Sequence, residues 1–527
     1  LKVGVIDSLG RRRDLVSLPQ LKPLLADADS VIAEHAAASL VEIGGKDALA
    51  ALSAARAQSL PAVQPAVADA LLQCAERLLA GGNGRGAAAL YRSLFDANLP
   101  PQIRAAAWRG LVLSDSARRV DMMTQALAGA DRLTHVAALK LIRELEDAPV
   151  INACLKQWAK LPADSQVALL DANLKLGPKA LPTVRAAVGS AHLTVRVAAW
   201  QALASLEDSS MILALAQAAA QGAPAERDAA RDALTRLHGP GVDQAILKQI
   251  SKGEPPVKAE LLRALGERGD RGAVVVLLQY AGNTNEVVRL AALESLKKLA
   301  VADTLTPLLD LASQSKSERE RTRVLEALSA ICQASSDKDQ ATRSVLEALD
   351  RLLAAERCHL LPLLAELGTS AALTAAQAAS RAAEPALARE GVRVLTQWPN
   401  AAAAPTLLDL ARTSVDPTLQ LLALSGCITV AEQETDLAKR FDLLQQAMAT
   451  AKRPEEKRQA LGQIGQIPTP AALQIALAEV ADPSLANEAG LAAVNIAEKL
   501  AGANPQLADE AAVKVLAHCQ SLDTLKR

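Results

Sequence analysis

The side chains that most often perform acid–base, metal or thiol chemistry are few in this 527-residue chain, and they are scattered along it. They are His35, His135, His192, His238, His359 and His518, and Cys74, Cys154, Cys332, Cys358, Cys427 and Cys519. None of them has the HExxH or Cys-x-x-Cys spacing of a metal site. The two adjacent Cys/His pairs cannot easily share a metal, because neighbouring helical residues point about 100° apart. We therefore expect no metal site, packed cysteines and solvent-facing or helix-end histidines.

Motifs for holding phosphate or activating a nucleophile are also missing from the sequence. Residues 81–86 read Gly-Gly-Asn-Gly-Arg-Gly, but no strand pattern precedes them and no Gly-Lys-Ser/Thr follows. No Gly-x-Ser-x-Gly sequence occurs, and the carboxylates are spread without a distinct pair. We predict a chain that is not an enzyme and carries no cofactor, with residues 81–86 forming a flexible turn.

Two tryptophans are candidates for contacting a partner. Trp108 and Trp200 each lie three residues before a leucine, Leu111 or Leu203, that marks the same place in a repeat. Indoles facing a groove could stack on sugars or bases. At the equivalent places of other repeats the residues are Leu262, Leu293, Leu325, Val392 and Leu421. So many apolar equivalents favour packing between repeats, and partner binding through Trp108 and Trp200 is the alternative.

Three arginines recur at a second shared place, and they are the other candidate partner-binding residues. Arg104, Arg196 and Arg289 could form a ladder of positive charge for an acidic partner. The whole chain is balanced, with 57 basic and 58 acidic residues, whereas nucleic-acid binders usually carry a positive excess. Residues 11–13, Arg-Arg-Arg, are the densest basic cluster and fit a solvated turn. We expect no nucleic-acid partner.

The elements that must position these residues are helices. Half of the residues are apolar, mostly Ala and Leu, and only 2% are aromatic. Ala and Leu are the best helix formers, whereas strands favour β-branched and aromatic residues. The longest stretch without charge, residues 209–225, contains glutamines and a proline and is too short to span a membrane. We predict an all-α chain with no membrane span.

A repeated unit organises these helices. Leu203, Leu234, Leu265, Leu296 and Leu328 follow one another at intervals of 31 or 32 residues, each in an apolar run with helical spacing. Such a period is typical of a solenoid, in which stacked helix pairs share one continuous core. We predict a right-handed α-solenoid, a superhelix of about sixteen stacked antiparallel helix pairs.

The period is interrupted near residues 72–100, 333–345 and 432–445, where we expect irregular insertions. In the first, residues 85–95 predict an amphipathic helix with Tyr91 and Phe95 on one face, either in the core or exposed for recognition. The first and last residues fall inside repeat units without a polar cap. We therefore expect a single continuous solenoid over 1–527 that is a fragment of a longer chain.

These helix pairs resemble HEAT repeats, specifically the short bacterial kind also found in phycobilisome-lyase-like proteins. The resemblance rests on Val195, Arg196, Ala199, Ala202 and Leu203, on Val288, Arg289, Ala292 and Leu296, and on Ile103, Arg104, Ala107 and Leu111. Gly44, Gly368 and Gly465 stand where the second helix of such a repeat often ends. Residues 463–470 and 492–499 are similar to the HEAT block of large bacterial multidomain proteins.

The resemblance implies a non-enzymatic scaffold whose second helices line a concave surface for a protein partner or fused domains. It also implies that the recurring arginines bond to neighbouring turns. It leaves two alternatives: a chromophore-lyase-like or other ligand-handling protein, and an accessory module of a carbohydrate-active or haem-containing multidomain protein. No Cys-x-x-Cys-His haem attachment sequence occurs. The resemblance leans towards an exported bacterial protein, while the compartment and the oligomeric state stay open.

Overall fold

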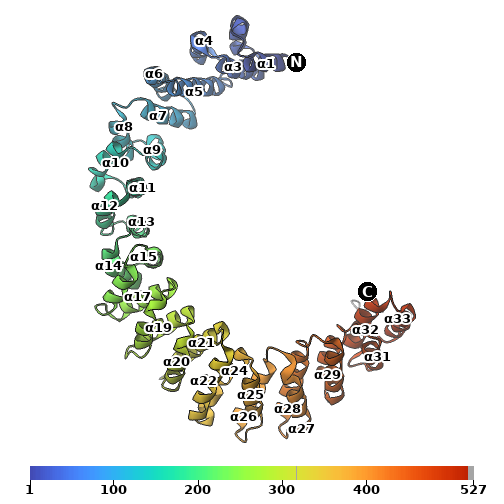
Figure 1. The fold of residues 1–527 in the computed structure, drawn as a ribbon. Coiled ribbons are helices and arrows are strands. Elements are labelled where there is room, and N and C mark those ends of the chain that lie inside the picture. The colour runs from blue at the N-terminus through green and yellow to red at the C-terminus, as the bar shows by residue number, and fades with distance from the viewer. Residues whose placement is uncertain (316, 520–527) are drawn as a thin grey trace. The chain divides into compact units, whose positions relative to one another are not determined.

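The computed structural model describes residues 1–315 and 317–519, which fold into 33 α-helices with short 3-10 turns between them and no strand. Contacts between helices divide the chain into two compact units, Leu1–Ala245 and Ile246–Arg527. In each unit, helices follow one another in antiparallel pairs (Figure 1). The earlier helix of a pair is its first helix and the later one its second helix. The predicted all-α solenoid of stacked helix pairs is confirmed.

The bounds in the first unit are as follows. Its second helices are α1 (Lys2–Arg11), α3 (Ser30–Ile43), α5 (Gln64–Ala80), α7 (Pro101–Ser114), α9 (Arg132–Glu144), α11 (Ala163–Leu174), α13 (Leu193–Leu203) and α15 (Pro224–Arg236). Its first helices are α2 (Leu18–Leu21) between η1 (Leu15–Ser17) and η2 (Lys22–Ala26), α4 (Gly45–Gln58), α6 (Gly84–Phe95), α8 (Arg119–Leu127), α10 (Ala148–Leu155), α12 (Leu181–Ala187) and α14 (Ile212–Gln221). The 3-10 turns η3 (Trp158–Lys160), η4 (Gly177–Ala180) and η5 (Ser209–Met211) lie between them.

Helix α16 (Val242–Ile250) crosses the boundary between the units. The second helices of the second unit are α17 (Pro255–Glu267), α19 (Glu286–Leu299), α21 (Glu318–Ala334), α23 (Ala354–Leu360) with α24 (Pro362–Leu367), α26 (Pro385–Thr396), α28 (Pro417–Ala431), α30 (Pro454–Ile464) and α32 (Ala486–Leu500). Its first helices are α18 (Val274–Ala281), α20 (Leu305–Ser313), α22 (Lys338–Arg351), α25 (Ser370–Ser380), α27 (Ala404–Thr413), α29 (Leu437–Thr450), α31 (Pro470–Glu479) and α33 (Pro505–His518), with turns η6 (Arg271–Ala273), η7 (Ala302–Thr304) and η8 (Ala401–Ala403).

Helix boundaries follow the local sequence. Side chains of Asp29, Asp131, Asn285 and Asp416 accept hydrogen bonds from the first free N–H groups of α3, α9, α19 and α28. Several second helices start with proline, whose missing N–H costs nothing at that position. The last residues of the chain, on which the expectation of a fragment rests in part, lie outside the described residues.

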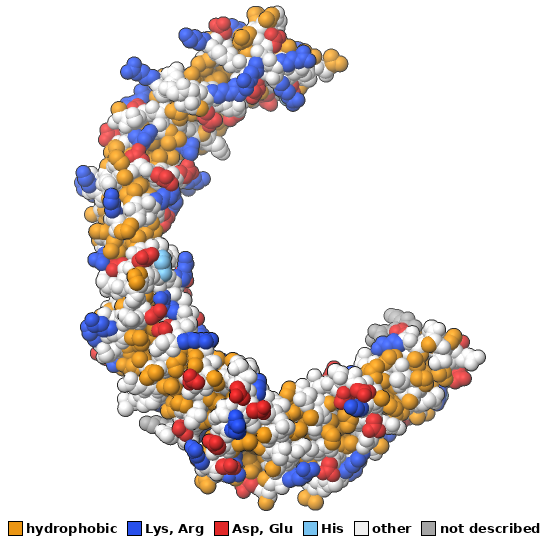
Figure 2. All heavy atoms as spheres, in the orientation of Figure 1, with side chains coloured by type: hydrophobic (Ala, Val, Ile, Leu, Met, Phe, Trp, Pro, Cys, Tyr) orange, Lys and Arg blue, Asp and Glu red, His pale blue; other side chains and the backbone are white. Residues whose placement is uncertain are grey.

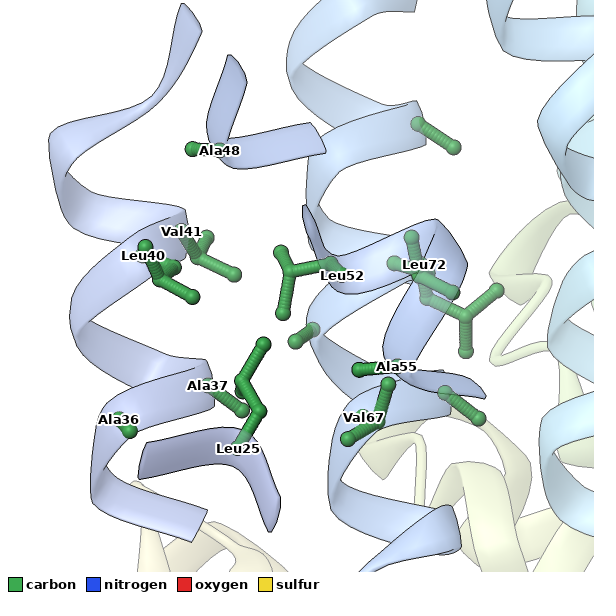
Figure 3. Packing of buried hydrophobic residues seen from close by; sticks show 14 of the residues in the cluster. Leu25, Ala36, Ala37, Leu40, Val41, Ala48, Leu52, Ala55, Val67 and Leu72 are labelled. Carbon is green, nitrogen blue, oxygen red and sulfur yellow. The ribbon is translucent and has the colours of Figure 1, made fainter. Parts of the chain in front are cut away.

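The core runs along the stack of pairs. Most second helices pack on the first helix of their own pair and on the neighbouring second helices of their unit. The marker leucines Leu203, Leu234, Leu265, Leu296 and Leu328 are all at most 1% exposed. In the first unit, Leu25, Leu40, Leu52 and Val67 interdigitate with small alanines from α3 and α4 (Figure 3). Burial of one leucine contributes about 1.5–3 kcal/mol, so a helix pair too short to fold alone is stabilised by its neighbours.

Two junctions bring second helices unusually close. Gly10 of α1 faces Ser39 of α3, and a Cβ on Gly10 would lie 2.8 Å from the Ser39 Cα. The Ser39 hydroxyl donates to the Ile6 carbonyl at 2.9 Å. In the second unit, Gly266 of α17 faces Ser295 of α19 in the same way, and the Ser295 hydroxyl donates to the Leu262 carbonyl at 2.9 Å. A glycine–serine contact therefore sets the helix spacing once in each unit.

The helix predicted for residues 85–95 is α6, and its aromatic face belongs to the core. Tyr91 is 3% exposed, and its ring fills the space where Gly110 of α7 lacks a side chain. Phe95 packs against the core from a half-buried position. The core interpretation of Tyr91 is thereby confirmed, and the alternative of an exposed recognition patch is wrong for this residue.

The cysteines give a first testable prediction. Cys154, Cys332, Cys427 and Cys519 are buried free thiols, and Cys74 and Cys358 are half-buried, as the sequence predicts. Burial raises the pKa of Cys332 and of Cys427 to about 12. Because only the thiolate attacks disulfide reagents, we expect Ellman's reagent to leave these two thiols unmodified in the native chain and to modify both after denaturation. Peptide mapping measures this, and native modification of Cys427 as fast as that of Cys358 would contradict it.

Candidate partner-binding surface

The fourth residue of many second helices bonds back to the turn that precedes the helix. Arg104 of α7 donates from Nε to the Phe95 carbonyl at 3.0 Å, and its guanidinium lies 5.4 Å from the centre of the Phe95 ring. Arg196 of α13 donates to the Ser190 carbonyl at 2.9 Å. Arg289 of α19 donates to the carbonyls of Asn283 and Thr284, both at 2.9 Å. The structure thus places the three predicted arginines at one equivalent position, where they cap free carbonyls.

Sequence reasoning missed further residues at this position, among them Arg357 of α23, which donates to the Leu352 carbonyl at 2.9 Å, and three that are not arginines. These three are His135 of α9, Gln166 of α11 and Gln420 of α28, which bond to the carbonyls of Ala126, of Trp158 and Leu161, and of Ser414. The signal that could have found them is the position itself, four residues into each second helix. The recurring donor is therefore part of the framework.

Two of the arginines also join successive repeats. Arg196 forms a two-point ion pair with Glu226 of α15, at 3.0 and 3.2 Å. The Trp200 indole donates to the same carboxylate at 3.1 Å. The hydrogen bond from Arg196 lowers the pKa of Glu226 most, with the Trp200 bond and the Arg196 charge adding to it against the effect of burial. Arg289 pairs with Glu320 of α21 at 3.0 Å, and both side chains are 8% exposed.

Both predicted tryptophans lie in the core. Trp108 and Trp200 are each 4% exposed. Trp108 packs in the first unit with Val112, Met123 and Leu127. An indole buried to this extent offers no face for stacking on a sugar or base, so their positions favour the packing interpretation. A partner surface must therefore be built from other side chains.

His135 is held between two repeats. Its side chain is 12% exposed, its Nδ1 lies 3.0 Å from the Ala126 carbonyl, and its Nε2 lies 2.9 Å from the carboxylate of Asp164 in α11. Partial burial lowers the pKa of His135, but the bonds to Asp164 and Ala126 and the Asp164 charge outweigh it, so the pKa is raised. The pKa of Asp164 is lowered: partial burial opposes this, and the hydrogen bonds from His135 and the Ser165 amide prevail.

This pair predicts a pH-dependent stability. Because the folded pKa of His135 is raised, its contribution is complete below the unfolded value near 6.5 and is lost as the pH rises through the folded pKa. The variant His135→Gln keeps a donor for the Ala126 carbonyl, as Gln166 does at its own turn, but cannot titrate. We expect the free energy of unfolding of the native chain to be higher than that of this variant by less than about 1 kcal/mol near neutral pH. In mild alkali the difference should be smaller still. The midpoints of denaturant unfolding of both chains, measured across pH, give this stability difference. A difference that does not change with pH would contradict a contribution from the titration of His135.

A groove between α7 and α9 is an open surface with unsatisfied positive charge. It encloses about 660 Å³ and is lined by Pro101, Arg104, Ala105, Ala106 and Arg109 of α7, and by Asp131, Arg132, Leu133, Val136, Ala137, Lys140 and Glu144 at the start of and along α9. Arg109 pairs with Glu144 at 2.8 Å across one end. Arg132 and Lys140 are exposed and have no hydrogen-bond or ion-pair partner among the described residues. We call this surface the α7–α9 groove.

Many other charged side chains of the second helices are paired within the chain. The second helices carry cross-repeat pairs such as Arg77 with Glu42, Arg143 with Asp171 and Lys297 with Glu326. Figure 2 shows basic and acidic side chains interspersed over the face in view, with hydrophobic ones between them. Within residues 1–315 and 317–519, no three His, Cys, Asp or Glu side chains gather as a metal site would need, and no helix is long and apolar enough to cross a membrane.

The fold and this surface define an all-α solenoid of stacked helix pairs whose second helices present mixed charged and aliphatic side chains. Residues 244–329 match the family model of HEAT repeats. The resemblance to HEAT repeats is thereby confirmed for this segment. No curated protein matches the chain.

Solved structures similar to this chain include long helical proteins. Yeast importin-β (Kap95p) is 13% identical, with 97% of this chain and 83% of that chain covered and a TM-score of 0.36. Kap121p bound to Pho4p is 11% identical, with 99% and 71% covered and a TM-score of 0.44. The complex of CpcE and CpcF of phycocyanin lyase from Nostoc sp. PCC7120 is 20% identical, with 51% and 94% covered and a TM-score of 0.23. At such low identities and TM-scores, no functional argument rests on them.

Proposed function

We propose that this chain is a non-enzymatic scaffold that binds a protein partner, or neighbouring domains, through the exposed side chains of its second helices. The observation that supports this most is the α7–α9 groove, an open surface with an aliphatic floor and basic residues that lack partners. Free charge beside apolar surface is typical of a surface that is completed by another protein. The recurring arginines and the buried tryptophans, in contrast, stabilise the packing of one repeat on the next.

The second helices suit this role because their other faces are already used. In most of them, one side packs on the first helix of the same pair, and the flanks pack on the neighbouring second helices. The side left open is regular, since each repeat offers it at the same place. A partner can then contact several repeats without any repeat changing its fold.

Site-specific photo-crosslinking in the native cell tests the proposal. A photoreactive residue replaces exposed Ala106 or Gln201 on second helices, and exposed Gln125 or Gln217 on first helices serve as matched controls. We expect a discrete protein adduct, or an adduct to a fused domain, from the second-helix positions and none from the controls. Equal adducts from both sets, or none from any position, would overturn the proposed function.

A further inference from the structure

Two unpaired cations on α9 stand on the same side of the helix as an exposed valine. Arg132, Val136 and Lys140 follow one another at intervals of four residues, which places them in a row along one helix face. The two cations are about 12 Å apart along the axis, at about 1.5 Å per residue. Val136 is 47% exposed between them. The row thus reads as positive, aliphatic, positive.

The opposite wall of the α7–α9 groove completes this pattern. Ala105 of α7 and Ala137 of α9 are small enough to leave a shallow apolar floor beside Val136. Arg104 and Arg109 add positive charge along α7, and the acidic groups of the lining are engaged: Asp131 caps α9 and Glu144 pairs with Arg109. The groove therefore keeps a net positive rim around an aliphatic floor.

Another groove of the solenoid lacks this property. The groove along α21, α23 and α24 encloses about 490 Å³. There Glu326 is paired with Lys297 at 3.0 Å and Glu366 accepts from Gln333 at 2.8 Å. Its charges are satisfied within the chain, so it offers no comparable preference for an anion.

We propose that the α7–α9 groove binds an extended acidic peptide segment of a protein partner. Carboxylates of the peptide meet Arg132 and Lys140, and an aliphatic side chain between them rests on Val136 and Ala105. An extended chain rises about 3.3 Å per residue, so two carboxylates about four residues apart span the two cations. This inference rests on the proposed function and specifies the chemistry of its partner.

A nucleic acid fits the same groove less well. Stacking platforms for bases are aromatic, and the lining contains no aromatic residue. The cations are few, whereas a phosphate backbone needs a longer basic stripe. The aliphatic floor instead rewards an apolar side chain.

Fluorescence anisotropy with the full chain tests the proposal. The probe is a short labelled peptide with acidic residues on both sides of a central leucine, compared with peptides in which glutamine replaces the acids or alanine replaces the leucine. We expect the acidic peptide to bind and each replacement to weaken binding by about tenfold, equivalent to about 1.4 kcal/mol. Equal binding of the glutamine peptide, or displacement of the acidic peptide by a single-stranded oligonucleotide of matched charge, would overturn the proposal.

Matched charge reversals locate the binding. The double variant Arg132→Glu with Lys140→Glu should lose at least about tenfold in affinity. The control double variant Arg12→Glu with Lys179→Glu makes the same charge change at exposed residues of the same unit outside the groove, and it should bind as the native chain does. Val136→Ser should weaken binding through the floor, without any charge change.

These results separate the two proposals. Equal affinities of the groove variant and the control variant, or no peptide binding at all while second-helix crosslinks to a partner persist, would overturn the acidic-peptide inference alone. Loss of those crosslinks overturns the proposed function itself. All substituted side chains are exposed, and circular dichroism of each variant confirms that the helices are retained.

Discussion

The variant Arg289→Leu should destabilise the second unit by about 3–5 kcal/mol, the usual cost of removing one partner of a buried ion pair. Arg289 and Glu320 are each 8% exposed, so the carboxylate cannot regain its lost interaction from bulk water. The carbonyls of Asn283 and Thr284 lose their donor as well. Unfolding in denaturant measures the loss of stability, and hydrogen exchange shows where in the chain it occurs. Because repeats interact mainly with neighbours, exchange should increase in α19 and α21 and stay unchanged in α27 and α28.

A surface pair on the same helix provides the control. Arg323 and Glu326 of α21 lie 2.9 Å apart with side chains 43% and 32% exposed. Exposed pairs contribute about 0–1 kcal/mol, so Arg323→Leu should change stability little. If Arg289→Leu were as mild as this control, Arg289 would not join the two repeats as we describe.

The second large effect concerns Gly266. The change Gly266→Ala places a Cβ 2.7 Å from the Ser295 Cα, a backbone atom that can move only if α17 and α19 separate. Forcing atoms into a packed contact costs about 1–3 kcal/mol, which exceeds the gain of less than about 1 kcal/mol from replacing a helical glycine. We expect a net loss of stability, measured as a lower midpoint of thermal unfolding.

Gly462 of α30 tests the same substitution without the contact. A Cβ there would meet nothing within 4 Å, and the residue lies near the end of a second helix in the same unit, as Gly266 does. Gly462→Ala should therefore stabilise the chain by about 0.5–1 kcal/mol. If both variants were more stable than the native chain, helix propensity, and not the Ser295 contact, would determine the result.

The repeat architecture could be predicted from the sequence because each repeat encodes its own helices. Leu203, Leu234 and Leu265 sit one repeat apart, and all are buried in the stack. Helix starts can likewise be predicted from capping side chains such as Asp131, which caps α9. These features depend on local propensity and periodicity, which a single sequence contains.

Contacts between repeats were harder to predict, since they depend on residues about thirty positions apart. The ion pairs Arg196–Glu226, Arg289–Glu320 and His135–Asp164 each join a second helix to the next one. A search for opposite charges one repeat apart would have found these pairs. The close approach at Gly266 gives no such signal, because a glycine near a helix end usually marks a cap.

The α7–α9 groove was beyond sequence reasoning for a different reason. Lys140 and Arg143 lie on the same helix, yet Arg143 pairs with Asp171 at 2.8 Å while Lys140 has no partner among the described residues. Which cations stay free is decided by the reach of side chains on adjacent helices. The recurring candidate residues instead lie in contacts that hold the repeats together, where recurrence reflects the packing of one repeat on the next.

Hydrogen exchange of the free chain and of the chain bound to its crosslinked partner tests the central claim most directly. The account predicts that protection on binding falls on second helices, with α7 and α9 among the protected segments, while the first helices α8 and α10 exchange as in the free chain. Protection confined to first helices, or no difference along either unit, would contradict a scaffold that binds through its second helices.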